Sequence, residues 1–192
     1  MESLKLRVAL LMTFLILIVN GIIGSIAADM QGKSNSKAAP QTNFTSVYTD
    51  MRQDCKSLPE PPGTPEGVDP IVACKGYGDY RILISYSACT AGLEVESLKN
   101  PNDTISLGED YGDGRGGGRK VEWRMANSKP FAVIIRFGKH KGDDFCAFER
   151  TDSKLVIKGL KDWEHIDFEI DGATPDANVK AREMADQNYS KK

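Results

Sequence analysis

The sequence contains few of the residues that support chemistry at neutral pH. Its 192 residues include only two histidines, His140 and His165, and four cysteines, and its 27 acidic residues against 25 Lys and Arg give a formal net charge of −2. The lack of a basic excess argues against a nucleic-acid-binding protein. No two cysteines form a Cys-x-x-Cys pair, which argues against a structural zinc site. We therefore expect no nucleic-acid partner, no metal and no other cofactor.

Long hydrophobic runs are absent except near the N-terminus. Residues 8–24 are almost entirely apolar, two basic residues precede them, and the small residues Ser25 and Ala27 follow. This order is typical of a secretory signal peptide, so residues 1–27 are predicted to be a signal peptide cleaved after Ala27. We expect a periplasmic or extracellular protein. The alternative is an uncleaved anchor with the domain outside the membrane, because the run is close to the lower limit of about 17 residues for a membrane span.

The remaining chain is predicted to be a tether followed by one folded domain. Residues 28–45 are mostly polar and lack a hydrophobic period, as expected of a flexible tether. Residues 46–190 are predicted to form a single disulfide-bonded domain. With 40% hydrophobic and 27% charged residues in the whole chain, the composition is that of an ordinary globular protein.

Short apolar runs alternate with turn residues through most of this domain, which is typical of antiparallel β-structure. In residues 130–137 the apolar side chains alternate with period two, and this most apolar segment should lie centrally in a sheet. The glycine-rich residues 108–120 and the proline-rich residues 58–65 are predicted to be loops. Other strands are expected at residues 71–74, 80–86, 93–97, 121–125, 145–148, 155–160 and 164–170.

The hydrophobic period changes after residue 170, where a helix is predicted. Thr174 is placed to cap this helix, which should continue to about Asn188. Arg182 and Asp186 are spaced for an i,i+4 ion pair. One stripe of the helix carries Ala177, Ala181, Met184, Ala185 and Asn188, and should pack on the sheet. The predicted fold is therefore α+β: a curved antiparallel sheet of about seven to nine strands, open or barrel-like, with a C-terminal helix packed on it.

The four cysteines, Cys55, Cys74, Cys89 and Cys146, all lie in the exported part. Disulfides are the normal state of cysteines in an oxidising compartment, so we predict two disulfides and no free thiol. Three pairings are possible. We favour Cys55 with Cys74, which closes the proline-rich loop, and Cys89 with Cys146.

No group of residues indicates a catalytic site. His140 lies between lysines and glycines, which predicts an exposed turn, and His165 shares the polar face of a strand with Asp167. A His-Asp pair can orient a general base, but no nucleophile is marked for it. The paired carboxylates at 109–110 and 143–144 stand beside glycines, with nothing to indicate burial. We predict no catalytic residue and no enzyme, and a hydrolase using His165 is the remote alternative.

Several short motifs follow one another along residues 48–186. They are Tyr48-Thr49-Asp50, Cys55, the segment Cys74 to Tyr80, Glu122-Trp123-Arg124, Pro130-Phe131-Ala132 with Arg136, and the segment Ala177 to Asp186. Their order resembles that of a family of uncharacterised exported bacterial proteins. The resemblance implies export, a small α+β domain and the Cys55–Cys74 bridge, but brings no known activity or site. Members tend to have a cysteine where this chain has Glu164-His165, and Cys89 and Cys146 look like additions.

Together these patterns predict an exported, non-enzymatic domain that binds an unidentified partner or has a structural role in the cell envelope. Membrane contact is expected only through an uncleaved N-terminal segment. The alternative is an inhibitor of an envelope or host enzyme, similar to lysozyme inhibitors, with residues 75–80 or 108–120 as the inserted loop.

Overall fold

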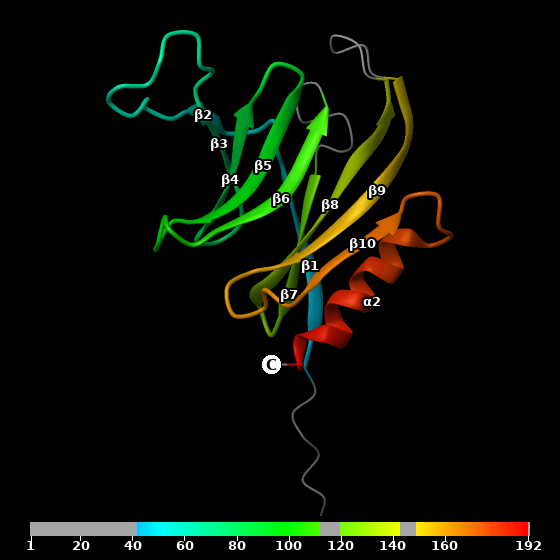
Figure 1. Cartoon of the computed structure of the whole chain (residues 1–192). Coiled ribbons are helices and arrows are strands. Elements are labelled where there is room, and N and C mark those ends of the chain that lie inside the picture. Colours follow the sequence, from blue (N-terminus) through cyan, green and yellow to red (C-terminus); the bar gives the residue numbers. More distant parts are fainter. Residues whose placement is uncertain (1–41, 112–119, 143–148, 192) are drawn as a thin grey trace, which may run out of the picture. The chain divides into compact units, whose positions relative to one another are not determined.

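The computed structural model describes residues 42–111, 120–142 and 149–191, which form ten strands and one helix (Figure 1). Sheet 1 has the spatial order β1-β7-β8-β9-β10 and consists of β1 (Phe44–Asp50), β7 (Lys120–Ala126), β8 (Lys129–Lys141), β9 (Glu149–Gly159) and β10 (Asp167–Asp171). Sheet 2 follows chain order and consists of β2 (Cys55–Ser57), β3 (Val72–Lys75), β4 (Tyr80–Tyr86), β5 (Thr90–Ser97) and β6 (Thr104–Tyr111). The helix is α2 (Ala177–Tyr189).

The predicted combination of antiparallel β-structure and a C-terminal helix is confirmed. All strand pairs are antiparallel, but the described residues form ten strands in two five-stranded sheets rather than seven to nine in one. β6 was not predicted because Gly108 breaks its apolar pattern. Gly108 adopts a φ of 117° where the register between β5 and β6 shifts, a conformation that glycine accommodates at a bulge.

Some predicted boundaries differ from those observed. β6 continues to Tyr111 and β7 begins at Lys120, so the predicted loop at 108–120 is partly strand, and residues 112–119 lie outside the described residues. The predicted strand at 145–148 also lies outside them. β1 begins at Phe44, two residues before the predicted start of the domain at residue 46.

The two sheets pack face to face around one hydrophobic cluster. Its members from sheet 1 include Val133, Ile135 and Phe137, which share one face of β8 as the alternation predicted. Phe131, which the same alternation places on this face, packs instead in the second cluster described below. Trp123 of β7 is completely buried there. Its indole Nε1 donates a hydrogen bond of 2.8 Å to Thr49 Oγ1, and its ring stacks on Tyr80 with 5.9 Å between centroids. A hydrogen bond therefore connects this core residue directly to edge strand β1.

The opposite face of sheet 1 carries the helix, as Figure 1 shows. The alanines at 177, 181 and 185 are buried in a second cluster with Ala132, Ile134, Leu155 and Ile157 of β8 and β9. The predicted alanine stripe is thus confirmed, and the helix ends one residue after the predicted Asn188. Because alanine side chains are small, the helix backbone can lie close to the sheet, and polar side chains on the two elements can reach one another.

The predicted helix cap is wrong. Asp176, with a φ of 57°, occupies the N-cap position in place of Thr174. The Thr174 N–H donates to the Asp171 carbonyl at 3.0 Å, and the Ala173 N–H donates to Asp171 Oδ1 at 3.0 Å. These bonds form a separate turn after β10, so the helix begins only after that turn is complete.

The Asp171 carboxylate should stay ionised to a lower pH in the folded protein than in the unfolded chain. A hydrogen bond from Lys139 and a second from the Ala173 N–H lower the pKa of this carboxyl from its ordinary value of 3.8. Because the folded pKa is depressed, the stability linked to this group is present above the unfolded pKa and is lost as the pH falls through the folded one. An NMR titration of the side-chain carboxyl carbons measures this shift.

Lys139→Ala should raise the pKa of Asp171 toward 3.8, and Lys129→Ala, which removes an exposed lysine from the start of the same strand, should leave it unchanged. An Asp171 that titrates at its ordinary pKa in the wild-type protein would contradict this prediction.

Candidate functional site

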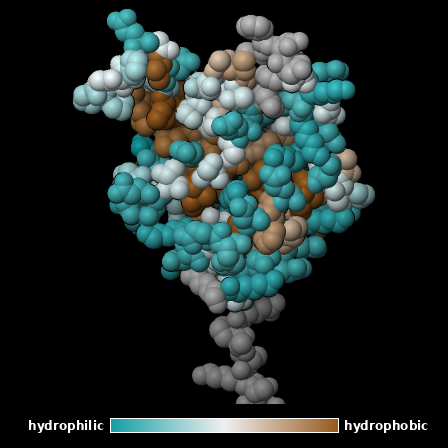
Figure 2. All heavy atoms as spheres, viewed as in Figure 1, coloured by the Kyte–Doolittle hydropathy of each residue, from teal (hydrophilic) through white to brown (hydrophobic). Residues whose placement is uncertain are grey.

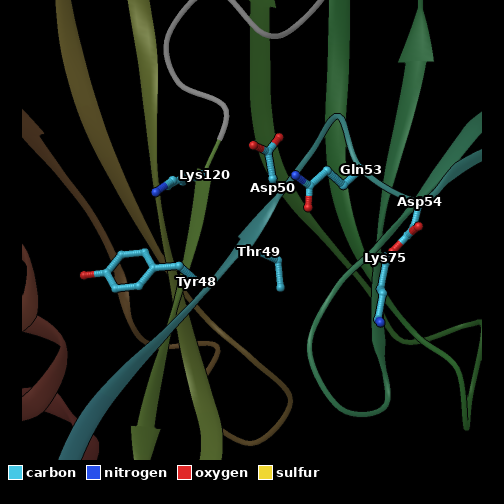
Figure 3. A pocket seen from close by; sticks show the side chains of 7 residues that line it. All are labelled: Tyr48, Thr49, Asp50, Gln53, Asp54, Lys75 and Lys120. Atoms are coloured by element: carbon cyan, nitrogen blue, oxygen red, sulfur yellow. The ribbon is translucent and has the colours of Figure 1, made fainter.

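A polar pocket lies at the C-terminal end of β1, and we call it the β1 pocket. Its volume is about 400 Å³, and it is lined by Tyr48, Thr49, Asp50, Gln53, Asp54, Lys75 and Lys120 (Figure 3). These residues come from β1, the turn after it, the end of β3 and the start of β7. The pocket therefore lies where the chain leaves sheet 1 and enters sheet 2.

Local hydrogen bonds and a disulfide build the wall of this pocket. Asp50 Oδ1 accepts a hydrogen bond of 2.9 Å from the Arg52 N–H, which turns the chain at the end of β1. Asp54 has a φ of 54° and leads into Cys55, which pairs directly with Cys74 across β2 and β3. The disulfide between these cysteines fixes the turn against β3, whose last residue is Lys75.

Both signs of charge occur in the β1 pocket, and both lysines in it are exposed. No described residue forms a hydrogen bond or ion pair with the amino group of Lys75 or Lys120. The Asp50 carboxylate is paired within the protein, because Arg52 Nε lies 3.9 Å from Asp50 Oδ1. The two ammonium groups are therefore available to acceptor groups of a ligand.

A second cavity, the helix pocket, lies between α2 and sheet 1. Its volume is about 300 Å³, and it is lined by Tyr48, Lys120, Glu122, Ile134, Arg136, Leu155, Asn178 and Arg182. Tyr48 and Lys120 line both pockets. Tyr48 is 49% exposed, and Figure 3 shows its ring on the opposite side of β1 from Asp54 and Lys75. The two pockets are therefore neighbours along one edge of sheet 1.

Ion pairs connect α2 to β7 beside the helix pocket. Asp186 binds Arg124 through two hydrogen bonds of 2.7 and 2.5 Å, and Arg182 Nε donates to Glu122 Oε1 at 2.6 Å. The bond to Glu122 raises the pKa of the Arg182 guanidinium. The predicted Arg182–Asp186 pair is therefore wrong. Both side chains instead bind the buried charges of β7, which need counter-charges because they are removed from water.

His165 and Asp167 do not pair with each other. The Nε2 atom of His165 lies 2.9 Å from the Asn188 carbonyl oxygen near the end of α2, and Asp167 forms an ion pair with Lys158 at 2.7 Å. A hydrolase using His165 would need Asp167 to orient the imidazole, and these contacts do not place the two side chains together.

The prediction of an exposed turn at His140 is wrong. β8 continues through this residue to Lys141, and the His140 side chain is 8% exposed. Its Nδ1 lies 3.8 Å from Oδ1 of Asp110, whose side chain is 1% exposed, so this carboxylate is buried despite its neighbouring glycines. A Cβ on Gly138 would lie 2.4 Å from the His140 ring, so the glycine that suggested a turn makes room for the imidazole. The carboxylates at 143–144 lie outside the described residues.

One of the two predicted disulfides is confirmed, and the pairing of the other stays a prediction. Cys55 and Cys74 form a disulfide, and Cys89 is also disulfide-bonded. Its predicted partner, Cys146, lies outside the described residues. Among residues 42–111, 120–142 and 149–191, no cysteine is free and no three His, Cys, Asp or Glu side chains are grouped to hold a metal ion. Within these same ranges, no helix has the length and hydrophobicity needed to cross a membrane.

One of the two predicted insertion loops is packed onto the domain. In the segment from Lys75 to Tyr80, Gly76 is buried, and a Cβ on it would lie 2.4 Å from the Tyr80 carbonyl oxygen and 3.0 Å from the Trp123 ring. Tyr80 itself stacks on Trp123. This segment is a tight turn against the core and does not project. Residues 112–119 of the other predicted loop lie outside the described residues.

No family profile, no curated protein and no solved structure matches this chain. The resemblance to a family of exported bacterial proteins therefore stays a prediction.

Proposed function

We propose that this protein is an exported, non-enzymatic binding domain that recognises an extended segment of a protein partner at the β1 pocket. The observation that carries this proposal is a polar pocket on an edge strand with two lysines, Lys75 and Lys120, whose amino groups no described residue binds. An ammonium group that the protein itself does not neutralise can form an ion pair with an acidic group of a partner, and such charge complementarity supports specific recognition.

The position of β1 supports an extended segment as the ligand. Among the described strands, β1 pairs with β7 alone, so one of its edges offers backbone N–H and C=O groups to another chain. A peptide that adds to such an edge gains main-chain hydrogen bonds, and pockets beside the edge select its side chains. The two lysines favour a partner segment with acidic side chains.

The Cys55–Cys74 disulfide supports export, because disulfides persist in oxidising compartments. Intact-mass spectrometry of the natural protein tests this part of the proposal. A chain that begins at Ala28 and exposes alkylatable cysteines only after reduction would support export with cleavage. An uncleaved mass would indicate the anchored alternative, and thiols that react without reduction would contradict an oxidised domain.

Site-specific photo-crosslinking tests the binding proposal. A photoreactive residue at Gln53, which lines the β1 pocket, should crosslink to a partner from the natural source in a saturable manner, whereas the same residue at Ser85, exposed on β4, should not. Lys75→Glu should reduce crosslinking tenfold or more, and Lys129→Glu should leave it unchanged. Equal crosslinking from Gln53 and Ser85, or none from either, would reject the β1 pocket as the recognition site.

A second candidate function, inhibition of an envelope or host enzyme such as a lysozyme, is favoured by the loop between β2 and β3. Val68 and Ile71 are exposed apolar side chains in this loop. A hydrogen bond of 2.8 Å from the Leu58 N–H to the Ile71 carbonyl and the Cys55–Cys74 disulfide close its base. Figure 1 shows the loop projecting from the sheets, and Figure 2 shows hydrophobic surface on the same side of the domain.

A lysozyme turbidity assay with the exported domain tests this second function. If it is correct, the wild-type domain inhibits, Val68→Asp and Ile71→Asp each weaken inhibition tenfold or more, and Val179→Asp, on the exposed face of α2, does not. No inhibition by the wild-type domain at micromolar concentration would exclude lysozyme as the target.

A further inference from the structure

Three arginines lie between α2 and sheet 1, and one of them, Arg136, has no carboxylate as a hydrogen-bond partner among the described contacts. Arg124 binds Asp186 and Arg182 binds Glu122, whereas the described hydrogen bonds of Arg136 reach only neutral oxygens. Its Nη1 donates to Ser153 Oγ at 2.8 Å and its Nη2 donates to Asn178 Oδ1 at 3.2 Å. Since a guanidinium carries five N–H groups, Arg136 retains both a full positive charge and unused donors.

The other polar groups around Arg136 in the helix pocket are also donors. No described residue binds the amino group of Lys120. Asn178 uses its carbonyl oxygen to accept from Arg136, which leaves its amide NH₂ for a ligand. The Tyr48 hydroxyl oxygen accepts from Arg182 at 3.0 Å, so its own proton remains available.

The one acidic side chain that lines the helix pocket is already neutralised. Glu122 accepts hydrogen bonds from Arg182 at 2.6 Å and from Ser46 Oγ at 2.5 Å. The charges that remain in the pocket are therefore those of Arg136 and Lys120, both positive. A cavity with two free cations and mainly free donors is suited to an anionic acceptor.

A glycine makes room for the Arg136 side chain, and the pocket is partly apolar. A Cβ on Gly172 would lie 2.6 Å from Arg136 Nη1 and 2.1 Å from Ser153 Oγ, so this position must be glycine for both groups to occupy their places. Ile134 and Leu155, both buried, supply apolar lining. An organic anion can thus place its charged group on Arg136 and a short apolar body on these two side chains.

We propose that the helix pocket binds a small organic oxyanion, a carboxylate or a phosphate monoester with a short apolar chain, and that Arg136 holds its charged group with help from Lys120 and Asn178. Planar guanidinium groups bind both kinds of oxyanion through two parallel hydrogen bonds. This site is separate from the recognition of a protein segment proposed above, although the two pockets share Tyr48 and Lys120.

Isothermal titration of the exported domain with hexanoate, hexyl phosphate and the neutral hexanamide tests the proposal. At least one of the two anions should bind saturably, and hexanamide should bind tenfold or more weakly, because it lacks the charge. Comparison of the two anions identifies which oxyanion the pocket prefers. The proposal would be overturned if neither anion bound at concentrations up to about 10 mM, or if hexanamide bound as well as the anions.

Matched variants locate the binding to this pocket. Arg136→Gln should weaken binding of the preferred anion tenfold or more. Lys180→Gln, which makes the same change in charge on the exposed face of α2, should leave the affinity for that anion unchanged. Asn178→Leu, at an exposed helix position, gives an independent test if Arg136→Gln does not fold, and should weaken binding severalfold. Unchanged affinity in a folded Arg136→Gln or Asn178→Leu protein would place the anion elsewhere and overturn the proposal.

The outcome is distinguishable from that of the crosslinking experiment, because neither Arg136 nor Asn178 lines the β1 pocket. Crosslinking from Gln53 that persists in Arg136→Gln, with no anion binding in the wild type, would reject the oxyanion site alone. Anion binding without crosslinking would reject the protein-binding function alone.

Discussion

Asp186→Ala should lower the free energy of unfolding by about 3 kcal/mol, because it leaves the Arg124 guanidinium unpaired in a largely buried position. The Arg124 side chain is only 10% exposed, and both of its hydrogen bonds to a carboxylate come from Asp186. Its remaining contacts, a hydrogen bond to Ser46 Oγ at 3.0 Å and the ring of Phe44 at 5.8 Å, do not replace a negative charge. Urea unfolding monitored by circular dichroism measures the change.

Two further variants show whether the loss comes from an unpaired charge. Glu183→Ala, at an exposed position three residues earlier on the same helix, should change stability by less than about 0.5 kcal/mol. The double variant Arg124→Met/Asp186→Ala should recover most of the loss, because it removes both charges together. A loss of less than about 1 kcal/mol in Asp186→Ala would mean that the pair behaves as an ordinary surface ion pair.

Trp123→Ala should lower the free energy of unfolding by about 3–5 kcal/mol, the range for removing a large aromatic side chain from a core. Trp123 is completely buried between the sheets, stacks on Tyr80 and donates a hydrogen bond of 2.8 Å to Thr49. The replacement therefore opens a cavity and leaves a β1 hydroxyl without its donor. Thermal and urea unfolding measure the loss, and near-UV circular dichroism reports the packing of the remaining aromatic residues.

Trp123→Phe separates the two contributions, because it keeps most of the apolar volume and removes the donor. Its loss should be clearly smaller than that of Trp123→Ala. Val179→Ala, which shortens a side chain on the exposed face of α2, should cost less than about 0.5 kcal/mol. A Trp123→Ala protein as stable as the Val179→Ala control would show that the indole does not hold the sheets together.

Local patterns predict the regular elements of this fold well. The strand at residues 80–86 was predicted with its observed bounds, because its apolar side chains alternate and turn residues flank it. The alanine stripe of α2 was likewise predictable, since it depends only on helical periodicity. Both signals are carried by residues close together in sequence.

The candidate site could not be predicted in this way, because its residues meet only through the topology. The β1 pocket joins residues 48–54 with Lys75 and Lys120, which no sequence spacing connects. Arg182 was expected to bind a residue one turn away, but its partner, Glu122, lies 60 residues earlier in the chain. Gly138 misled the prediction for His140, because a glycine that makes room for a ring has the same sequence signature as a glycine in a turn.

The sharing of Lys120 by the two pockets has a thermodynamic consequence. Its single ammonium group can neutralise an acidic side chain of a partner segment bound in the β1 pocket, or an oxyanion bound in the helix pocket, but not both fully at once. Occupation of one pocket should therefore weaken binding in the other, and because linkage is reciprocal, each ligand should lower the affinity of the other by the same factor. Such negative cooperativity would make a small anion in the surroundings a competitor that tunes how strongly the domain holds its partner.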